Sequence, residues 1–316
     1  MEILKQLYET YSPSGHENRM RRFIKRWARK HTPTAIIEYD SSGNIYITKG
    51  QSTSYPCIVS HMDQVQRTHS KDFKAIETEE IIFGFSLSNK RQEGPGCDDK
   101  NGIWCCLKCL ERYDICKAAF FVMEEVGCVG STNANMDFFK DCRFVLQADR
   151  RGANDLITTI FDDTCSPEFV SAINPEQYGY SPTHGLATDI GALKENGLEV
   201  SAINISCGYY NPHTDHEFTI KAELINCLHL IFHIFETCTE TYPHIGYGWG
   251  TLTSYNPYHD TDYEEAADMV YNYVSYYPDA SPDMVYEECH GLFPTLTRTD
   301  FERIFEEVAT LTEDTP

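Results

Sequence analysis

The chain has 316 residues and a formal net charge of −22, from 48 acidic and 26 basic side chains. This excess of negative charge argues against a nucleic acid or an anionic membrane as a partner. Hydrophobic residues make up 41% of the chain and aromatic residues 13%, which excludes wholesale disorder and allows a large α/β core.

The first five residues run directly into amphipathic sequence without the pattern of a signal peptide, and no apolar run approaches the roughly 18 residues of a membrane span. The 13 cysteines are odd in number and often lie in apolar segments, which predicts buried free thiols in a reducing compartment. Cys106 and Cys109 match the C-x-x-C spacing, but they lie in a helical pattern without a second pair, so we interpret them as core residues. We therefore expect a cytoplasmic protein.

Apolar positions predict a short helix at residues 4–8, which the Pro- and Gly-containing segment 11–15 ends. Ser14 and Glu17 have the spacing of a capping box for a basic helix over residues 19–30. Two β-rich runs follow, 35–39 and 44–48, joined by a turn signal.

The next strand, 57–60, is short and apolar, and it leads directly into His61 and Asp63. The twofold period of a strand puts these two side chains on the same side. A carboxylate beside an imidazole holds a metal-binding histidine in one tautomer. Residues 64–93 have the pattern of irregular hairpins, and they precede a Gly/Pro-rich turn that contains Asp98 and Asp99.

That turn leads into an apolar helical stretch, 103–110, whose N-terminal dipole favours negative charge. A buried strand over 118–123 ends at Glu124 and Glu125, and another over 144–148 ends at Asp149. Ligands gather outside the carboxyl ends of strands in open α/β sheets, so we expect these side chains to meet.

Further strands are predicted at 156–160 and 200–205, and a loop containing His213 precedes an apolar helical face over 224–235. After about residue 241 the chain becomes rich in Tyr, Asp and Glu, with helical patterns near 263–276 and 300–309.

The candidate ligands comprise two imidazoles and three carboxylates: His61, Asp98, Glu125, Asp149 and His213. This set suits zinc or manganese rather than calcium. Five ligands exceed the three protein ligands of a single catalytic zinc, but they give two metals three ligands each if one carboxylate bridges.

In these motifs the sequence resembles the co-catalytic dizinc exopeptidases of metallopeptidase clan MH, which include peptidase T, the zinc aminopeptidases and the tetrahedral aminopeptidases. The resemblance covers roughly residues 5–235. The matching pieces are His61-x-Asp63, Gly96-Cys97-Asp98-Asp99-Lys100-x-Gly102, Glu124-Glu125-x-Gly127, Asp149 and His213-Thr214, with amino-terminal segments at 11–17 and 40–44.

The resemblance implies a role for each matching residue. His61 and Asp149 would complete one metal site, Glu125 and His213 the other, and Asp98, rather than Asp99, would bridge the two. Two divalent metals are implied, with zinc the first choice and manganese or cobalt as alternatives. The group often has a cis peptide bond after the bridging Asp.

The two catalytic residues are also implied by the resemblance. Asp63 would orient His61, and Glu124 would be the general base that takes a proton from the metal-bridging water. His216 competes with His213, although the His-Thr-x-x-Glu spacing favours His213. Asp189 fits either a position on the substrate side of the site or a plain helix cap.

The spacing of the motifs excludes the inserted domains found in relatives. Asp149 and His213 lie 64 positions apart, and His61 and Asp98 lie 37 apart, too little for a lid or other full domain. We therefore expect a zinc exopeptidase-like α/β fold with a mixed, mostly parallel central sheet flanked by helices and no lid domain. A catalytic domain would span residues 1–240, with an acidic, Tyr-rich helical extension packed on it over residues 241–316.

The expected function is metal-dependent hydrolysis of peptide bonds at a free amino terminus, by an aminopeptidase or a di- or tripeptidase. Alternatives within enzymes are an amidohydrolase or deacylase, a carboxypeptidase, and a single-zinc cyclase acting on amino-terminal glutamine. The alternative of another class is an inactive, peptidase-fold binding protein. A peptide or amino-acid amide would be the partner, and the oligomeric state, including a homo-oligomer, is left open.

Two observations bear on whether such an enzyme would cleave peptides from the amino end or from the carboxyl end. Spare carboxylates at Asp99, Glu124 and Asp189 would attract a substrate ammonium and repel a carboxylate, which favours an aminopeptidase. Against this, Arg150 and Arg151 follow Asp149 directly, and a guanidinium can bind a carboxylate through two hydrogen bonds.

Overall fold

The computed structural model describes residues 1–160, 162–185, 188–245, 266–267, 269–271, 274, 280–289 and 296–313. The chain divides into two compact units, Met1–Gly250 and Thr251–Pro316, each with a hydrophobic core of its own. None of the helices in the described part is both long enough and apolar enough to span a membrane.

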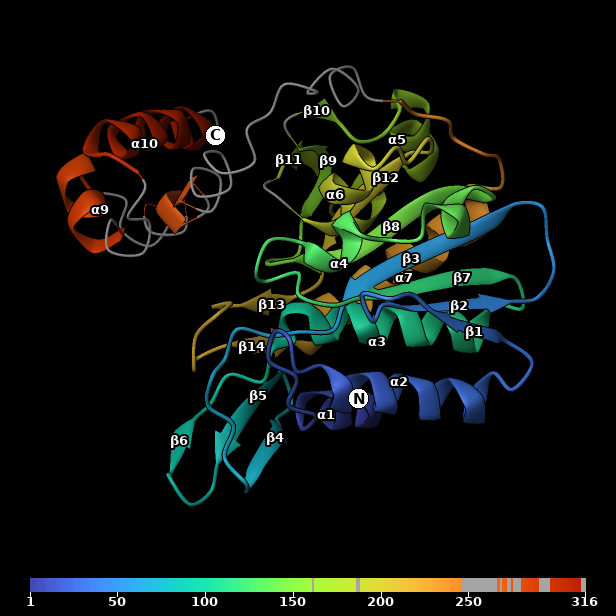
Figure 1. Cartoon of the computed structure of the whole chain (residues 1–316), viewed down its shortest axis with the longest axis horizontal. Helices are drawn as coiled ribbons and strands as arrows, with labels where there is room; N and C mark the ends of the chain where they lie inside the picture. Colours follow the sequence, from blue (N-terminus) through green and yellow to red (C-terminus); the bar gives the residue numbers. More distant parts are fainter. Residues whose placement is uncertain are drawn as a thin grey trace. The chain divides into compact units, whose positions relative to one another are not determined.

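A nine-stranded mixed sheet forms the centre of the first unit (Figure 1). Its neighbours are, in order, β1 (Ile36–Tyr39), β2 (Ile45–Lys49), β7 (Cys116–Phe121), β3 (Tyr55–His61), β8 (Cys142–Arg150), β12 (Ala202–Ser206), β9 (Asp155–Ile160) and β10 (Asp162–Asp163), with β11 (Ser181–His184) paired to β9. The central strands β7, β3, β8 and β12 are parallel to one another. This confirms the predicted α/β fold with a mostly parallel centre.

Helices cover both faces of this sheet, which is why β3, β7 and β12 are buried along their whole length. The helices are α1 (Glu2–Tyr8), α2 (Asn18–His31), α3 (Cys97–Arg112), α4 (Val129–Thr132), α5 (Pro167–Ile173), α6 (Asp189–Glu195) and α7 (Lys221–Thr237), with 3-10 turns at Met136–Phe139 and Pro175–Tyr178.

Successive residues of β3 show how the two faces alternate. Ile58 belongs to the larger hydrophobic cluster, with side chains of α1, α2, α3 and α7. The next residue, Val59, belongs to the smaller cluster on the opposite face, with Leu193 of α6 and Phe138. Figure 1 shows α2 and α3 on one side of the sheet and α4 and α6 on the other.

A second, antiparallel sheet of five strands lies beside the first. Its strands are β13 (Tyr209–Tyr210), β14 (Phe218–Ile220), β5 (Ile81–Ser86), β4 (Phe73–Glu77) and β6 (Arg91–Gln92). The expectation of hairpins in residues 64–93 holds for the regular pair β4–β5. The sequence did not predict that β14 would pair with β5, opposing Phe218 to Phe83.

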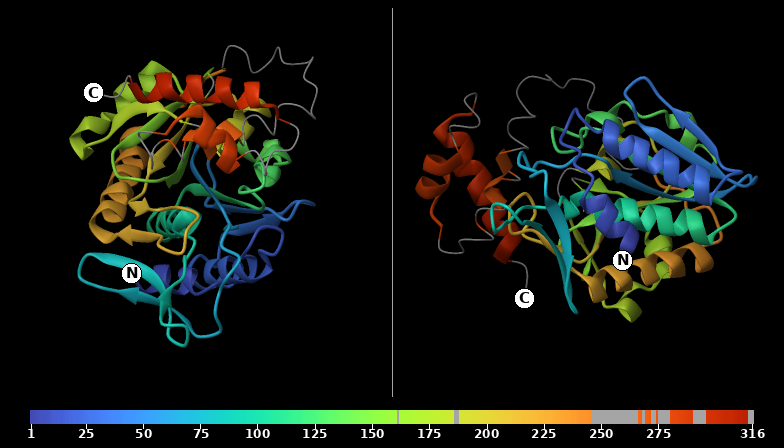
Figure 2. Two further views of the ribbon diagram at one scale, coloured as in Figure 1. Left: turned by 90° about the vertical axis from the view of Figure 1, so that its left-hand side faces the viewer. Right: turned by 90° about the horizontal axis from the view of Figure 1, so that it is seen from below.

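This sheet brings together two segments that are distant in the sequence, residues 73–92 and 209–220. Figure 2 shows the β4–β5 hairpin beside α1, where Lys5 pairs with Glu77 at 3.1 Å. Between Asp149 and His213, apart from residues 161 and 186–187, the described chain forms strands of the two sheets and short helices. No lid domain is inserted in this part.

The predicted capping box at the start of α2 is wrong. The helix begins at Asn18 after Glu17, and no side chain caps it. Instead, the Ser14 hydroxyl donates to Asp63 Oδ2 at 2.7 Å. Glu17 Oε1 accepts from the backbone N–H of Gly15 at 2.8 Å and of Met123 at 3.3 Å. Each side chain thus has a partner in a distant segment, Asp63 for Ser14 and Met123 for Glu17, instead of forming the reciprocal local cap.

The second unit contains α9 (Pro282–Cys289) and α10 (Arg298–Glu313), which confirms the helical pattern near residues 300–309. The pattern near 263–276 lies largely outside the described residues. A small hydrophobic cluster includes Val285, Phe301 and Ile304. The predicted docking of the acidic extension on the catalytic domain stays a prediction.

The twelve cysteines of the first unit are free, and all but Cys128 are buried. Cys106 and Cys109 lie inside α3 in the larger cluster, as expected for core residues. Burial raises the pKa of both thiols, which keeps them protonated and unreactive.

Candidate active site

The sequence-predicted residues of strands β3, β7 and β8 gather at one edge of the central sheet. His61 is the last residue of β3, Asp149 lies next to the end of β8, and Glu124 and Glu125 follow β7 after two residues. Because β7, β3 and β8 are parallel neighbours, their carboxyl ends bring these side chains to the same place.

Asp98 reaches this edge from the start of α3, where the backbone is not helical. Gly96 has a φ of 69°, a left-handed conformation that suits glycine, and Asp98 and Asp99 depart from helical angles. The Asp98–Asp99 peptide bond is cis, as the resemblance implied.

Two groups of three potential metal ligands share Asp98. In the first group, His61 Nε2 lies 3.0 Å from Asp98 Oδ1 and 3.7 Å from Asp149 Oδ1. In the second, His213 Nε2 lies 3.3 Å from Asp98 Oδ2 and 3.0 Å from Glu125 Oε2. Asp98 therefore presents one carboxylate oxygen to each group. We call these groups the His61 triad and the His213 triad.

Asp63 is fully buried beneath the His61 triad. Its Oδ1 lies 3.4 Å from His61 Nδ1 and accepts the backbone N–H of Glu124 at 2.9 Å. Its Oδ2 accepts from the Ser14 hydroxyl and from the backbone N–H of Glu125 at 3.2 Å. One carboxylate thus lies beside the imidazole of one triad and holds the backbone that carries the acidic residue of the other.

Glu124 lies beside the triads but belongs to neither. Its Oε2 is 3.8 Å from His61 Nε2, and its side chain is 13% exposed. Cys128 Sγ lies 3.7 Å from Glu124 Oε1. The carboxylate is thus close to the shared ligands and still reachable from outside.

Burial and, after it, repulsion between neighbouring carboxylates raise the pKa of most acidic residues at this edge. Burial raises the pKa of Glu124 and Asp149, and neighbouring carboxylates raise it further. Burial alone would raise the pKa of Asp98 too, but the imidazoles of His213 and His61 outweigh it and hold that pKa below its ordinary range. Cations between these carboxylates would replace repulsion with attraction.

The loop after β13 presents His213 with a φ of 63°, and its side chain is 46% exposed. His216, the competing candidate, lies outside the triads, with its Nδ1 2.7 Å from Gln92 Oε1. The structure therefore brings His213, and not His216, to the other candidate ligands.

Two of the proposed spare carboxylates have structural partners. Asp99 is buried, and it accepts from the backbone N–H of Gly102 at 2.9 Å and of His61 at 3.2 Å. Its carboxylate is thus engaged by the backbone of the site rather than free for a substrate. Asp189 begins α6, where Thr188 is the residue that caps the helix.

Asp189 connects to the His61 triad through a residue that the sequence did not single out. Gln147 Nε2 donates to Asp189 Oδ2 at 3.1 Å and to Asp149 Oδ2 at 3.0 Å. Asn204 holds the backbone of Asp149, accepting its N–H and donating to its C=O, both at 2.9 Å. Gln147 precedes Asp149 by two residues on β8, so strand periodicity could have indicated it.

Glu217 is buried, and the sequence reasoning used it only as the glutamate of the His-Thr-x-x-Glu spacing and missed its role. Its Oε2 accepts from the backbone N–H of Gly96 at 2.8 Å, and its Oε1 from that of Asp98 at 3.1 Å. Gln66 Nε2 donates to Oε2 as well, at 3.1 Å. Glu217 therefore ties the turn that carries Asp98 to the loop that carries His213, four residues before it.

The two arginines after Asp149 do not form an open carboxylate-binding site. Arg150 Nε donates to Asp155 Oδ2 at 3.1 Å, so its guanidinium already pairs with a carboxylate of its own chain. Arg151 also has an interaction partner.

Comparison with known proteins identifies structures that share the fold but no relative with a similar sequence. No family model matches the sequence, and no curated protein matches it significantly. Among solved structures, the aminopeptidase PepT from Bacillus cereus aligns with a TM-score of 0.59 and 12% identity, covering 75% of this chain and 97% of its own. An aminopeptidase from the archaeon Desulfurococcus kamchatkensis aligns at 0.56 and 16%, covering 81% and 98%.

The TET1 peptidase of Pyrococcus horikoshii aligns with a TM-score of 0.50 and 14% identity, covering 71% of this chain and 95% of its own. At these identities the likeness concerns the fold. The chain therefore has the fold of the exopeptidase group that its motifs resemble.

The role of Glu217 can be tested through stability. In Glu217→Ala the buried N–H groups of Gly96 and Asp98 lose their acceptor, which should cost about 1–3 kcal/mol for each unpaired group. Urea unfolding measures this loss. Glu111→Ala is the control, because among the described residues Glu111 pairs with Lys108 alone, on the surface of α3. It should change stability by less than about 0.5 kcal/mol. Equal midpoints for the two variants would contradict the anchoring role.

Proposed function

We propose that this chain is a metal-dependent peptidase that hydrolyses the peptide bond next to a free amino terminus. The observation that carries the proposal is the pair of triads that share Asp98. The solved structures that share the fold include aminopeptidases, which supports the proposal.

The residues present fit two divalent cations. His61 and Asp149 would hold one, Glu125 and His213 the other, and Asp98 both. Two imidazoles and three carboxylates are a donor set suited to zinc, with manganese and cobalt as alternatives. Glu125 Oε1 is buried and accepts no hydrogen bond from the described residues. A buried carboxylate oxygen normally has a partner, and a bound cation would supply one here.

Such cations, when bound, supply Lewis-acid activation of a water and stabilise negative charge on the substrate carbonyl. The chain's own residues do the rest. Glu124 takes the proton of the attacking water and returns it to the leaving amine. Asp63 holds His61 in the tautomer whose Nε2 faces Asp98 and Asp149.

The charge of the site favours a substrate ammonium. Glu124 is reachable from outside, and the nearby Asp189, which accepts a hydrogen bond from Gln147, adds negative charge to the same site. Asp99 contributes charge but no free oxygen, and Arg150 is paired. A free amino terminus is therefore the end of a peptide that this site would attract.

Two alternative functions are less well supported. A deacylase or carboxypeptidase would use the same metal chemistry, but the arginine next to Asp149 that would bind its substrate's carboxylate pairs with Asp155. An inactive binding protein would not need Glu124 beside two complete triads. A cyclase with a single zinc would not need the His213 triad.

Two further proposals concern the oligomeric state of the protein and the compartment in which it works. The TET1 peptidase of Pyrococcus horikoshii can assemble into a tetrahedron or a large octahedral shell, so a homo-oligomer is a reasonable proposal for this chain. Its free, buried cysteines support a reducing compartment such as the cytoplasm.

Metal content tests the shared role of Asp98. Protein saturated with zinc and then freed of excess metal should hold two zinc ions per chain by elemental analysis. Asp98→Asn should lose both, because it removes charge from each triad, whereas Asp149→Asn should keep the ion of the His213 triad. One ion or none in the unaltered protein would contradict the proposal.

The two adjacent glutamates should differ in their effects. Glu124→Gln should keep both metals and lower kcat by about 10²–10⁴, the range for loss of a general base. Glu125→Gln should instead weaken metal binding. Kinetics and elemental analysis of both variants decide this. Equal metal loss in the two, or near-normal turnover of Glu124→Gln, would refute the division of roles.

The direction of attack is tested with one peptide in two forms. The peptide with a free amino terminus should be cleaved from that end, and the same peptide acetylated there should be a much poorer substrate because it lacks the ammonium. Mass spectrometry of the products identifies the released residue. Equal cleavage of both forms, or release from the carboxyl end, would exclude an aminopeptidase.

A further inference from the structure

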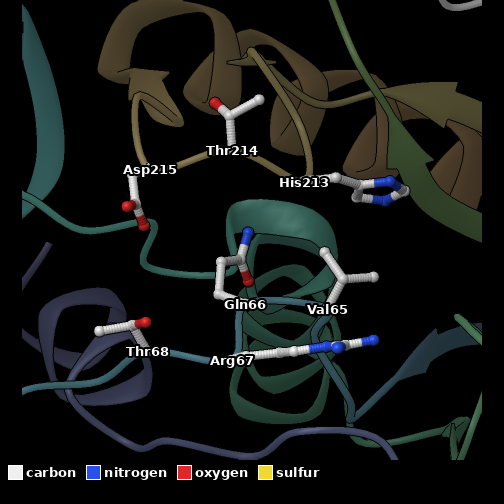
Figure 3. A pocket seen from close by; sticks show the side chains of 7 residues that line it. All are labelled: Val65, Gln66, Arg67, Thr68, His213, Thr214 and Asp215. Atoms are coloured by element: carbon white, nitrogen blue, oxygen red, sulfur yellow. The ribbon is translucent and has the colours of Figure 1, made fainter. Parts of the chain in front are cut away.

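An open hollow of about 480 Å³ borders the His213 triad. It lies between the segment that follows β3 and the loop that carries His213. The lining residues are Val65, Gln66, Arg67, Thr68, His213, Thr214 and Asp215 (Figure 3). Its volume is within the range of sites for small ligands. Because His213 is part of both the hollow and a triad, a ligand in the hollow lies next to the proposed reaction centre.

The walls of the hollow are held in place by buried contacts. Gln66, beneath it, donates to Glu217, which also anchors the Asp98 turn. Gly94 separates the two walls: a Cβ at this position would lie 2.4 Å from the Thr214 carbonyl oxygen and 2.7 Å from Gln66 Cγ. The hollow is therefore fixed to the same framework as the triads.

Arg67 is the one lysine or arginine that lines the hollow. Within the described part of the chain, its guanidinium has no hydrogen bond or ion pair. Some exposed arginines pair with carboxylates of the chain, as Arg112 does with Glu236 at 2.9 Å, whereas others, such as Arg29 on α2, form no ion pair with the described residues. Arg67 differs from these in that it lines a hollow beside a triad. An arginine left without an internal partner beside a carboxylate-rich site is suited to an anion from outside.

Figure 3 shows how the charges are distributed around the hollow. The Arg67 side chain extends past Val65 toward the same side as the His213 ring, whereas Asp215 lies on the opposite side. Asp215 Oδ1 is also within 3.4 Å of the backbone N–H of Gly94. An anion at the guanidinium is therefore separated from the only carboxylate among the lining residues.

We propose that Arg67 binds the terminal carboxylate of a short peptide substrate, and that the hollow is the subsite for its carboxyl end. This inference rests on the proposed function, which puts the amino end at the carboxylate-rich side near Glu124. The peptide would then be held at both ends, by negative charge around its ammonium and by Arg67 at its carboxylate. The substrate class is a di- or tripeptide, because a longer chain would carry its carboxylate beyond the hollow.

The test compares trialanine with its carboxyl-terminal amide, which removes only the negative charge. Binding is measured by calorimetry on zinc-loaded Glu124→Gln protein, and turnover on the zinc-loaded protein with Glu124 intact. The free acid should bind about tenfold to a hundredfold more tightly than the amide. This is the difference in affinity expected from one charge-assisted hydrogen-bonded pair. Arg67→Gln should bring this ratio to about one, and Arg67→Lys should keep part of it.

Arg29→Gln on the exposed face of α2 is the matched control, because it removes the same charge away from the site and should keep the full ratio. A ratio of about one before any change at Arg67, or a ratio that Arg67→Gln leaves intact, would overturn the proposal. The proposal would also be overturned if inorganic phosphate displaced the peptides while the protein bound the acid and the amide equally well. That result would indicate a general anion site. The two proposals can also fail separately. If the protein binds the acid more tightly than the amide, and only with Arg67 present, but cleaves neither peptide, the subsite is upheld and the peptidase function is refuted.

Discussion

Repulsion among the carboxylates at the carboxyl ends of β7, β3 and β8 is the interaction on which the rest of the site depends. Asp98, Glu125 and Asp149 converge within a few ångströms of two imidazoles, with Glu124 beside them. Such crowding is unfavourable unless hydrogen bonds and cations compensate it. The surrounding chain supplies the hydrogen bonds, and the geometry of the triads is suited to the cations.

The compensating hydrogen bonds also give the site its rigidity. Asp63 accepts from the backbone of Glu124 and Glu125, while Gln147 and Asn204 hold the side chain and backbone of Asp149. Each ligand is thus positioned by a neighbour that is itself buried. In proposed metal sites of this kind, the outer residues orient the inner ones and tune their basicity.

The second sheet has a role in the site as well as in the fold. By pairing β14 with β5, it carries the His213 loop to the segment after β3, and Glu217 then joins this loop to the Asp98 turn. The His213 triad and the hollow beside it are consequences of that pairing. The second sheet thus places Arg67 and His213 around the same hollow.

Local sequence predicted the principal strands of the central sheet, the long helices and the residues at the strand ends, but not the short strands β10, β11, β13 and β14. His61, Glu125 and Asp149 could be predicted because parallel strands end at one edge, so a polar residue directly after an apolar run is placed by the sheet itself. Only the tertiary structure decided the partners of Ser14 and Glu17, which leave the predicted cap for Asp63 and Met123, and the roles of Gln147, Glu217 and Arg67. A buried polar group binds whichever donor or acceptor folding buries beside it, and periodicity along the chain does not record which distant segment that will be.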